Sequence, residues 1–394
     1  MERTLAQFRG DRAAKIAREQ GIDLIITSLP ANTEYFSGFS SVGMQILYSA
    51  ECYLVYQPQD GGMGLVVSAA DVPTVMEAGY TGWIYALGAF RFHMPGQDAY
   101  TEALRAAIDR RYASAAQALA QAVRDIAPNA GIIAVDEARM PPGTWNALET
   151  ELAGKCLLSG NHMLHRIKSV KHPEEIALLK NAANVAEDAL LALIPSIRAG
   201  TSEYDMERLY KQEVTARDAN PHFFVATANA RGAFSDTWNR PWNKVQEGSA
   251  IRFDFGCIYR GFCSDLSRTA LLGHNPKAEA YYGAVRAGEE RAIAAIKPGV
   301  TAGEIFEIAV RETQKAGIPH YWRHHVGHGI GVSTYDLPSI AHNDPTVLEA
   351  GMVLCIETPY YEIGWGGVQV EDTVVVTGDG AQYLTNTPRE LIKI

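Results

Sequence analysis

The sequence predicts an α/β domain over residues 1–160, followed by a larger α+β domain over residues 161–394. Up to residue 160, short apolar runs of strand length alternate with stretches of helical spacing, as in α/β domains. Beyond residue 250, long segments alternate apolar and polar residues, which indicates antiparallel strands. A length of 394 residues also favours two domains. We place the boundary in the polar, basic segment 160–172.

In the N-terminal domain, the expected elements follow one another at short intervals. Residues 9–19 space alanine and isoleucine among charged residues, which is typical of a surface helix. The apolar run 23–28 ends before Pro30 and predicts a buried strand. The other expected elements are strands at 52–56, 64–68 and 131–135 and a helix at 113–125.

The C-terminal domain is expected to begin with a long helix. Pro173 suits the first helical position, and an apolar stripe follows it as far as Leu193. Two further helices are predicted after Asn275 and at the capping box Thr301–Glu304. The extended segments are 250–259, 261–270, 352–357 and 367–376.

Composition and charge exclude several classes of protein. The chain is 47% hydrophobic and 20% charged, and its formal net charge of −10 argues against nucleic acid or an anionic membrane as a partner. The five cysteines form no C-x-x-C pair, so we expect reduced, packed thiols in a cytoplasmic protein. The first residues lack an apolar signal-peptide core, and no run is long enough for a transmembrane helix.

Four acidic residues stand isolated in apolar strand segments. A hairpin with residues 259 and 260 as its loop would place Asp254 directly opposite Asp265. Glu357 and Glu371 would face each other in the same way on the last two long strands. One opposed Asp pair is more often a surface feature than a site. Four acids in apolar strands are costly unless protons or metal ions neutralise them.

A histidine-rich segment near these acids supports a metal site. His328 lies between glycines, and His324 and His325 precede it. An oxygen-rich ligand set suits divalent ions, and one imidazole shifts the preference toward manganese, iron, cobalt or zinc. A lone histidine is more often a packed residue, but three among glycines favour a ligand with a proton-handling neighbour.

Several strings resemble the pita-bread metallopeptidase family, which includes aminopeptidase P, prolidase, methionine aminopeptidase and creatinase. They are Asp254-Phe-Gly with Ser264-Asp-Leu-Ser-Arg-Thr269, Gly327-His-Gly-Ile-Gly331, Ile356-Glu-Thr-Pro359 and Val370-Glu-Asp372. The resemblance implies a C-terminal pita-bread (creatinase/aminopeptidase) fold with a smaller creatinase/prolidase-like N-terminal domain. For the N-terminal part it rests on residues 21–27 and 32–39.

The resemblance also implies roles for individual residues. Asp254, Asp265, His328, Glu357 and Glu371 would bind two divalent metal ions per chain, with manganese favoured over iron, cobalt or zinc. Asp265 and Glu371 would bridge the ions, and a hydroxide between them would be the nucleophile. His324, Glu357 and Tyr335 are the expected catalytic groups. The implied activity is hydrolysis of a peptide or amide bond, as in Xaa-Pro aminopeptidases and dipeptidases.

Three positions depart from the family pattern and leave the substrate open. Thr237 and Tyr335 stand where substrate-facing histidines are expected, and Gln369 stands where prolidases have arginine. The alternative is a hydrolase or lyase for a small non-peptide metabolite, like creatinase or the dimethylsulfoniopropionate lyases. Seven aromatic residues near the motifs are candidates for a cation–π cage around such a molecule: Trp238, Trp242, Tyr321, Trp322, Tyr360, Tyr361 and Trp365.

The expected partners are a short peptide or another small molecule and a second copy of the chain in a homodimer. A non-catalytic binding or scaffold protein is a further alternative. In the family this role generally accompanies the loss of metal ligands, and all five are present here.

Overall fold

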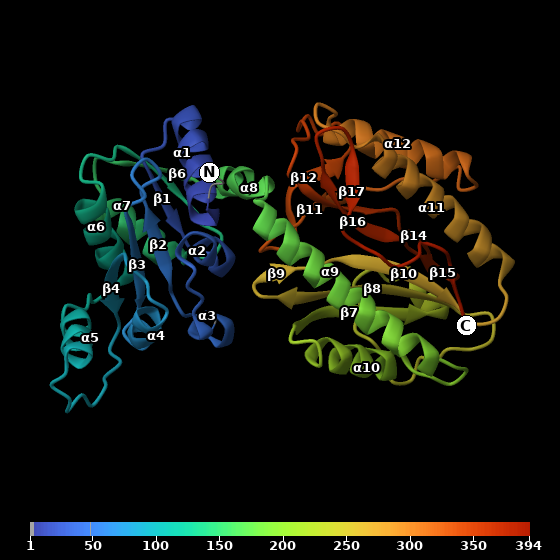
Figure 1. The fold of residues 1–394 in the computed structure, drawn as a ribbon, viewed down its shortest axis with the longest axis horizontal. Helices are drawn as coiled ribbons and strands as arrows, with labels where there is room; N and C mark the ends of the chain where they lie inside the picture. Colours follow the sequence, from blue (N-terminus) through green and yellow to red (C-terminus); the bar gives the residue numbers. More distant parts are fainter. Residues whose placement is uncertain (1–3, 48) are drawn as a thin grey trace. The chain divides into compact units, whose positions relative to one another are not determined.

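The computed structural model describes residues 4–47 and 49–394, and these form two compact units that divide between Lys168 and Ser169. Each unit is built around its own sheet (Figure 1). The domain limits 1–160 and 161–394 stay a prediction. No helix in the described part of the chain is long and apolar enough to cross a membrane.

The first unit is an α/β layer structure around a six-stranded mixed sheet in the order β4-β3-β2-β1-β5-β6. Its strands are β1 (Leu24–Thr27), β2 (Tyr53–Tyr56), β3 (Met63–Ser68), β4 (Trp83–Leu87), β5 (Ile132–Val135) and β6 (Cys156–Ser159). Its helices are α1 (Leu5–Gln20), α2 (Pro30–Ser37), α3 (Val42–Ile46), α4 (Val72–Glu77), α5 (Ala99–Asp109), α6 (Ala115–Ile126), α7 (Pro142–Glu151) and α8 (Asn161–Ser169).

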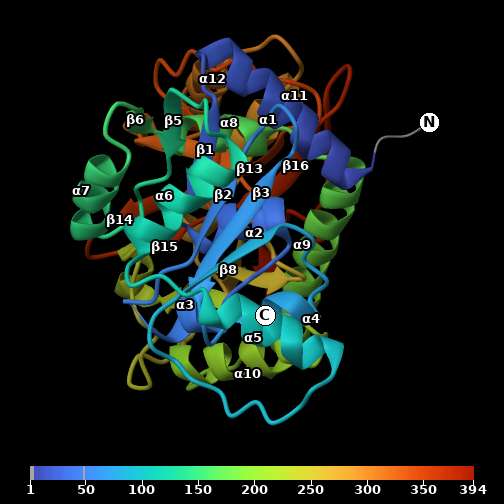
Figure 2. The same ribbon diagram turned by 90° about the vertical axis from the view of Figure 1, so that its left-hand side faces the viewer.

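The expected elements of this unit are all present, with ends that differ by a few residues. Helix α1 starts at a capping box between Thr4 and Gln7 and ends at Gly21, whose φ of 67° suits a helix end. The alanine-rich helix α6 packs across β2, β3 and β4 (Figure 2). The polar segment at the predicted boundary is helix α8, which buries Met163, Leu164 and Ile167.

The second unit contains a ten-stranded sheet whose main path is β12-β11-β13-β16-β10-β8-β7. The strands on that path are β7 (Asn220–Ala228), β8 (Ala250–Tyr259), β10 (Leu266–Leu271), β11 (His325–Gly329), β12 (Asp336–Ala341), β13 (Val353–Glu357) and β16 (Glu371–Val376). Three short strands pair outside the path, namely β9 (Phe262–Cys263), β17 (Ala381–Tyr383) and β18 (Ile392–Lys393), and β14 (Tyr360–Glu362) pairs with β15 (Gly366–Val368).

Two helix pairs flank this sheet (Figure 1). Helices α9 (Pro173–Leu193) and α10 (Glu203–Thr215) pack against β7 and β8. Helices α11 (Pro276–Ala295) and α12 (Ala302–Lys315) pack against each other and next to the strands from β11 to β13. As predicted, α9 has Pro173 at its first position and α12 begins with a capping box at Thr301. The apolar side chains of α9, α10, β7, β8 and β10 form one core cluster.

Candidate metal centre

The five predicted ligands come from neighbouring strands of the large sheet. The strands β11, β13, β16, β10 and β8 are consecutive in the sheet order. Asp254 lies on β8, Asp265 directly precedes β10, and His328 lies on β11. Glu357 is the last residue of β13 and Glu371 the first of β16. Asp254 is half-buried and the other four are buried.

The predicted direct opposition of Asp254 and Asp265 is wrong, because Asp254 pairs with Ser267. The hairpin turn consists of Arg260 and Gly261, one residue later than expected, and their φ values are 48° and 83°. Positive φ at both central residues is the conformation that two-residue hairpins favour. The register therefore moves by two residues, and this even shift leaves Asp265 on the same face of the sheet as Asp254.

The ligand atoms of these residues form two overlapping groups. Oxygen atoms of Asp254, Asp265 and Glu371 lie within 4.8 Å of one another. Ligand atoms of His328, Cys355 and Glu371 meet the same limit. Glu371 belongs to both groups, so its carboxylate lies where two neighbouring cations would share a ligand.

Two buried polar atoms in these groups lack a hydrogen bond within the described residues: Nε2 of His328 and Oε1 of Glu371. The Nδ1 atom of His328 lies 2.9 Å from the carbonyl oxygen of Gly329, and Nε2 lies 3.5 Å from Oδ2 of Asp265. When Nδ1–H donates to that carbonyl, the Nε2 lone pair faces the acids, which is the orientation of a metal ligand. The other oxygen of Glu371 accepts a hydrogen bond from Ser267 Oγ at 2.9 Å. The donor set therefore fits a divalent cation.

Burial and mutual repulsion oppose ionisation of the acids. Burial first, and then the charge of Asp265, raise the pKa of Asp254 from 3.8 to about 7. The same two causes raise the pKa of Glu371 well above its usual 4.5, and burial also raises the pKa of Glu357. A divalent ion would remove this cost by neutralising the carboxylates.

Cys355 lies beside the acids but is a weak candidate ligand. It is the direct partner of His328 between β11 and β13. Its Sγ atom lies 3.5 Å from the carbonyl oxygen of Asp265, to which the thiol donates. Burial raises the pKa of this thiol well above 9.0, whereas metal ions bind the thiolate. Cys355 is thus a packed thiol, as expected from the sequence.

Glycines around His328 allow close approach between strands. Gly327 has a φ of 146°, and a Cβ atom there would lie 2.2 Å from the carbonyl oxygen of Cys355. A Cβ atom on Gly329 would lie 2.3 Å from the carbonyl oxygen of Leu337. Any larger residue would separate β11 from its neighbours and move His328.

A buried arginine that the sequence analysis missed contacts the acidic cluster. The Arg252 guanidinium donates from Nη1 to Oδ2 of Asp254 at 3.2 Å and to Oε1 of Gln369 at 2.8 Å. Gln369 Nε2 in turn lies 3.3 Å from Asp254 Oδ2 and 3.5 Å from Glu357 Oε2. The Tyr361 hydroxyl donates to Gln369 Oε1 at 3.3 Å. Gln369, which departs from the prolidase pattern, thus links Arg252 of β8 to the carboxylates of Asp254 and Glu357.

The two histidines that precede Val326 have different surroundings. His324 is exposed, whereas Nδ1 of His325 lies 3.3 Å from Oε1 of Glu357. The same Nδ1 accepts a hydrogen bond from the Gly327 N–H at 3.2 Å. Burial and the neighbouring His324 lower the pKa of His325 to about 3, so its imidazole is neutral. On the other side of Glu357, Arg323 Nη2 lies 3.8 Å from Oε2.

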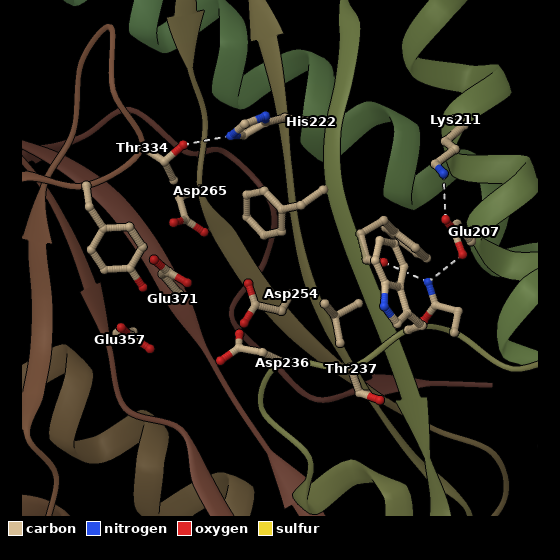
Figure 3. A pocket seen from close by; sticks show the side chains of 16 residues that line it. Glu207, Lys211, His222, Asp236, Thr237, Asp254, Asp265, Thr334, Glu357 and Glu371 are labelled. Carbon is tan, nitrogen blue, oxygen red and sulfur yellow. Dashed lines mark hydrogen bonds and ion pairs between the residues drawn. The ribbon is translucent and has the colours of Figure 1, made fainter. Parts of the chain in front are cut away.

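The acids open into a cavity of about 660 Å³ (Figure 3). Thr237 and Tyr335 both line it. The Thr237 hydroxyl accepts a hydrogen bond from Arg231 Nη2 at 3.2 Å. The Tyr335 ring stacks on His328 with the ring centroids 3.8 Å apart. Partial burial and nearby carboxylates raise the pKa of Tyr335 above 10, so its phenol is neutral and can donate. His324 is absent from the sixteen lining residues among those that the structure describes.

Of the seven aromatic residues proposed for a cation–π cage, Trp238 lines this cavity. The guanidinium carbons of Arg252 and Arg323 instead lie 5.1 and 5.3 Å from the centre of the Tyr361 ring. That of Arg231 lies 5.3 Å from the centre of the Trp242 ring. The predicted cage is therefore not assembled around the acids by the described residues.

Two family models match the chain. Residues 177–378 match the model of metallopeptidase family M24, and residues 9–170 match that of the creatinase/prolidase N-terminal domain. The sheet, the acids and these matches define a metal-dependent hydrolase. The chain belongs to metallopeptidase family M24, and its fold is the predicted pita-bread fold with a creatinase/prolidase-like N-terminal domain.

Individual relatives agree with this assignment. The Xaa-Pro dipeptidase of Pyrococcus furiosus is 34% identical over 234 residues, which are 57% of this chain and 66% of the relative. The Xaa-Pro dipeptidase of Pyrococcus horikoshii is 30% identical over 264 residues, 65% of this chain and 74% of the relative.

Solved structures show the same fold. A prolidase from Thermococcus sibiricus superposes with a TM-score of 0.84 at 20% identity, covering 100% of both chains. A Xaa-Pro dipeptidase from Bacillus anthracis gives 0.81 at 23% identity, covering 99% of this chain and 100% of that one.

Proposed function

We propose that this chain hydrolyses the peptide bond before proline in a dipeptide or a short peptide, using two divalent metal ions. The observation that supports it most is that four carboxylates line one cavity, and that one of them, Glu371, belongs to both groups of ligand atoms, the second of which includes His328. The names of the relatives, Xaa-Pro dipeptidases, support the substrate class.

In this proposal Asp254, Asp265, His328, Glu357 and Glu371 would hold the ions. When bound, the ions would lower the pKa of water, which supplies a hydroxide nucleophile at neutral pH. Manganese is the proposed metal, because the set is rich in oxygen with a single imidazole.

The chain's own groups have three tasks in the reaction. Glu357 accepts the proton of the attacking water and gives it to the leaving proline nitrogen. The neutral phenol of Tyr335 donates a hydrogen bond to the oxygen that becomes negative. His324 steadies the same charge, a role proposed from the family resemblance for an exposed residue that does not line the cavity. The support for Tyr335 is its place in the cavity beside His328.

The test is a hydrolysis assay on the full chain, stripped of metal and reloaded with manganese, with Ala-Pro and longer Xaa-Pro peptides. We expect release of proline from the dipeptide, and loss of that activity in Asp265→Asn at unchanged protein concentration. A protein that binds about two ions per chain but cleaves none of these peptides would contradict the proposal. The relatives do not favour the non-peptide alternative, which that result would restore.

The cell compartment and the oligomer are further proposals. The five cysteines are free thiols, which supports a reducing compartment such as the cytoplasm. A homodimer is proposed from the family resemblance. Size-exclusion chromatography with light scattering on the full chain would measure it directly.

A further inference from the structure

A single unpaired acid lines the cavity outside the proposed ligand set. Asp236 is exposed and lies on the loop between β7 and β8, and its carboxylate projects into the cavity beside that of Asp254 (Figure 3). Its carboxylate accepts a hydrogen bond from the neighbouring Ser235 hydroxyl at 3.3 Å. Among the described residues no basic side chain pairs with it, whereas Glu207 at the far wall pairs with Lys211 at 2.5 Å.

The backbone on the N-terminal side of Asp236 is fixed by Arg252. The Arg252 side chain is fully buried. Its Nη2 atom donates to the carbonyl oxygens of Phe234 and Ser235 at 2.8 and 2.7 Å. The same guanidinium contacts Asp254, so the segment before Asp236 is tied to a proposed metal ligand.

The backbone on the C-terminal side is fixed by Arg231 and Asn239. Arg231 Nη2 donates to the Trp238 carbonyl oxygen at 2.8 Å, and its Nε pairs with the buried Glu203 at 3.1 Å. The buried Asn239 donates to Phe224 O at 2.7 Å and accepts from Ala226 N–H at 2.8 Å. Asp236 therefore projects from a loop whose backbone is anchored on both sides, which limits how far the residue can move from the cavity.

The charge balance of the cavity indicates what this carboxylate would bind. Two divalent ions, together with the Arg252 guanidinium beside Asp254, would more than balance the carboxylates of Asp254, Asp265, Glu357 and Glu371. Asp236 is exposed, unlike the buried Glu357, and belongs to neither group of ligand atoms that the described residues form, so its negative charge faces the substrate. A carboxylate held in this way attracts an ammonium or guanidinium group and repels an anion.

We propose that Asp236 determines specificity by binding a cationic nitrogen on the N-terminal residue of the substrate. This rests on the proposed function, because that residue must lie beside the bond that is cleaved. The nitrogen comes either from the free α-amino group or from a lysine or arginine side chain at that residue. Either source restricts the enzyme to substrates with positive charge next to the scissile bond.

The test measures binding separately from cleavage. Manganese-loaded protein is compared on Ala-Pro and propanoyl-proline, which lacks only the amino group, and on Lys-Pro and norleucyl-proline, which lacks the side-chain charge. Each compound is first assayed for cleavage; compounds that are not cleaved are titrated by calorimetry, and cleaved ones are compared by KM. In at least one pair the wild-type protein should bind the charged member about 10-fold more tightly. Asp236→Asn should abolish that preference and leave the affinity for the uncharged member and the metal content unchanged.

The matched control is Asp188→Asn, the same change at an exposed position of helix α9. It should keep the charge preference. A preference in the first pair identifies the α-amino group, and one in the second identifies the side chain. Equal binding within both pairs by the wild type, a preference that survives in Asp236→Asn, or loss of metal from that variant would each overturn the inference. Charge-selective binding without cleavage would overturn the proposed function and leave this inference intact.

Discussion

Glu357 and Glu371 occupy directly opposed positions on β13 and β16, and both side chains are buried. This opposition was predicted from the sequence, and it is confirmed. Opposed residues on antiparallel strands have Cβ atoms about 4.5–5.5 Å apart, so two ionised carboxylates repel each other strongly there. Without a cation the pair destabilises the fold, and with one it becomes a binding site.

Glu371→Gln should therefore separate metal binding from stability. We expect the metal-free variant to unfold at the same or a higher temperature than the metal-free wild type, because one buried like charge is removed. Manganese should stabilise the wild type by about 2.7 kcal/mol at a hundred times its Kd, and the variant much less. Thermal unfolding with and without manganese measures both effects. Equal stabilisation of the two proteins by manganese would contradict a ligand role for Glu371.

Glu289, a buried acid outside the metal centre, should make the stability of the protein depend on pH. Glu289 on α11 is fully buried, and burial and the charge of Asp372 raise its pKa well above 4.5. A raised pKa in the folded state means that the folded protein binds the proton more tightly than the unfolded chain does. The stability it contributes is complete below pH 4.5 and is lost as the pH rises through the raised folded value.

Glu289→Gln should remove this loss, because the amide keeps the shape of the protonated acid. We expect the free energy of unfolding of the wild type to fall more steeply than that of the variant as the pH rises above 4.5. Urea unfolding at several pH values measures the two slopes. Parallel slopes would show that Glu289 ionises equally in both states.

Exchanging the residues at positions 252 and 369 tests whether Arg252 and Gln369 depend on each other for stability. Gln369→Arg alone brings a second guanidinium against Arg252, whose Nη1 lies 2.8 Å from Gln369 Oε1, and should cost about 2–4 kcal/mol of stability. Arg252→Gln alone leaves the carbonyls of Phe234 and Ser235 without their donor, at about 1–3 kcal/mol. The double exchange keeps one guanidinium and should be less destabilised than the sum of the two. Additive losses in urea unfolding would exclude coupling between these positions.

Much of the fold is readable from the sequence because its strands follow simple patterns. β8 and β13 appeared as apolar runs interrupted by one acid, and β16 as an apolar run after two acids; Asp254, Glu357 and Glu371 line one cavity in the structure. Helix α8 was missed because its polar residues suggested a boundary, although its buried Met163, Leu164 and Ile167 follow helical spacing.

The errors at the site came from details that periodicity does not record. The hairpin turn depends on positive φ at Arg260 and Gly261, which moved the register by two residues without changing the face. The contact of Arg252 with Gln369 joins residues 117 positions apart through side chains alone. Neither the turn conformation nor such a contact follows from the spacing of apolar residues.

Replacing Tyr335 tests how far the departures from the family pattern alter catalysis. Tyr335→Phe keeps the ring that stacks on His328 but removes the phenolic donor. If that donor stabilises the developing negative charge, kcat for Ala-Pro should fall about 100-fold with unchanged metal content. Steady-state kinetics with metal analysis would show this. Full kcat in Tyr335→Phe would mean that the ring serves only as a wall of the cavity.

The final prediction compares His324 with His325, because only His325 lies close to a proposed ligand, Glu357. His324 is exposed and does not line the cavity, and partial burial and Arg323 lower its pKa, so its imidazole is neutral. We expect His324→Ala to lower kcat/KM for Ala-Pro about 100-fold without changing the melting temperature or the metal content. His325→Ala should instead lower the melting temperature, because its Nδ1 accepts the hydrogen bond of the Gly327 N–H beside the proposed ligand His328. Full activity in His324→Ala together with stable, metal-loaded but inactive His325→Ala would transfer the catalytic role to His325.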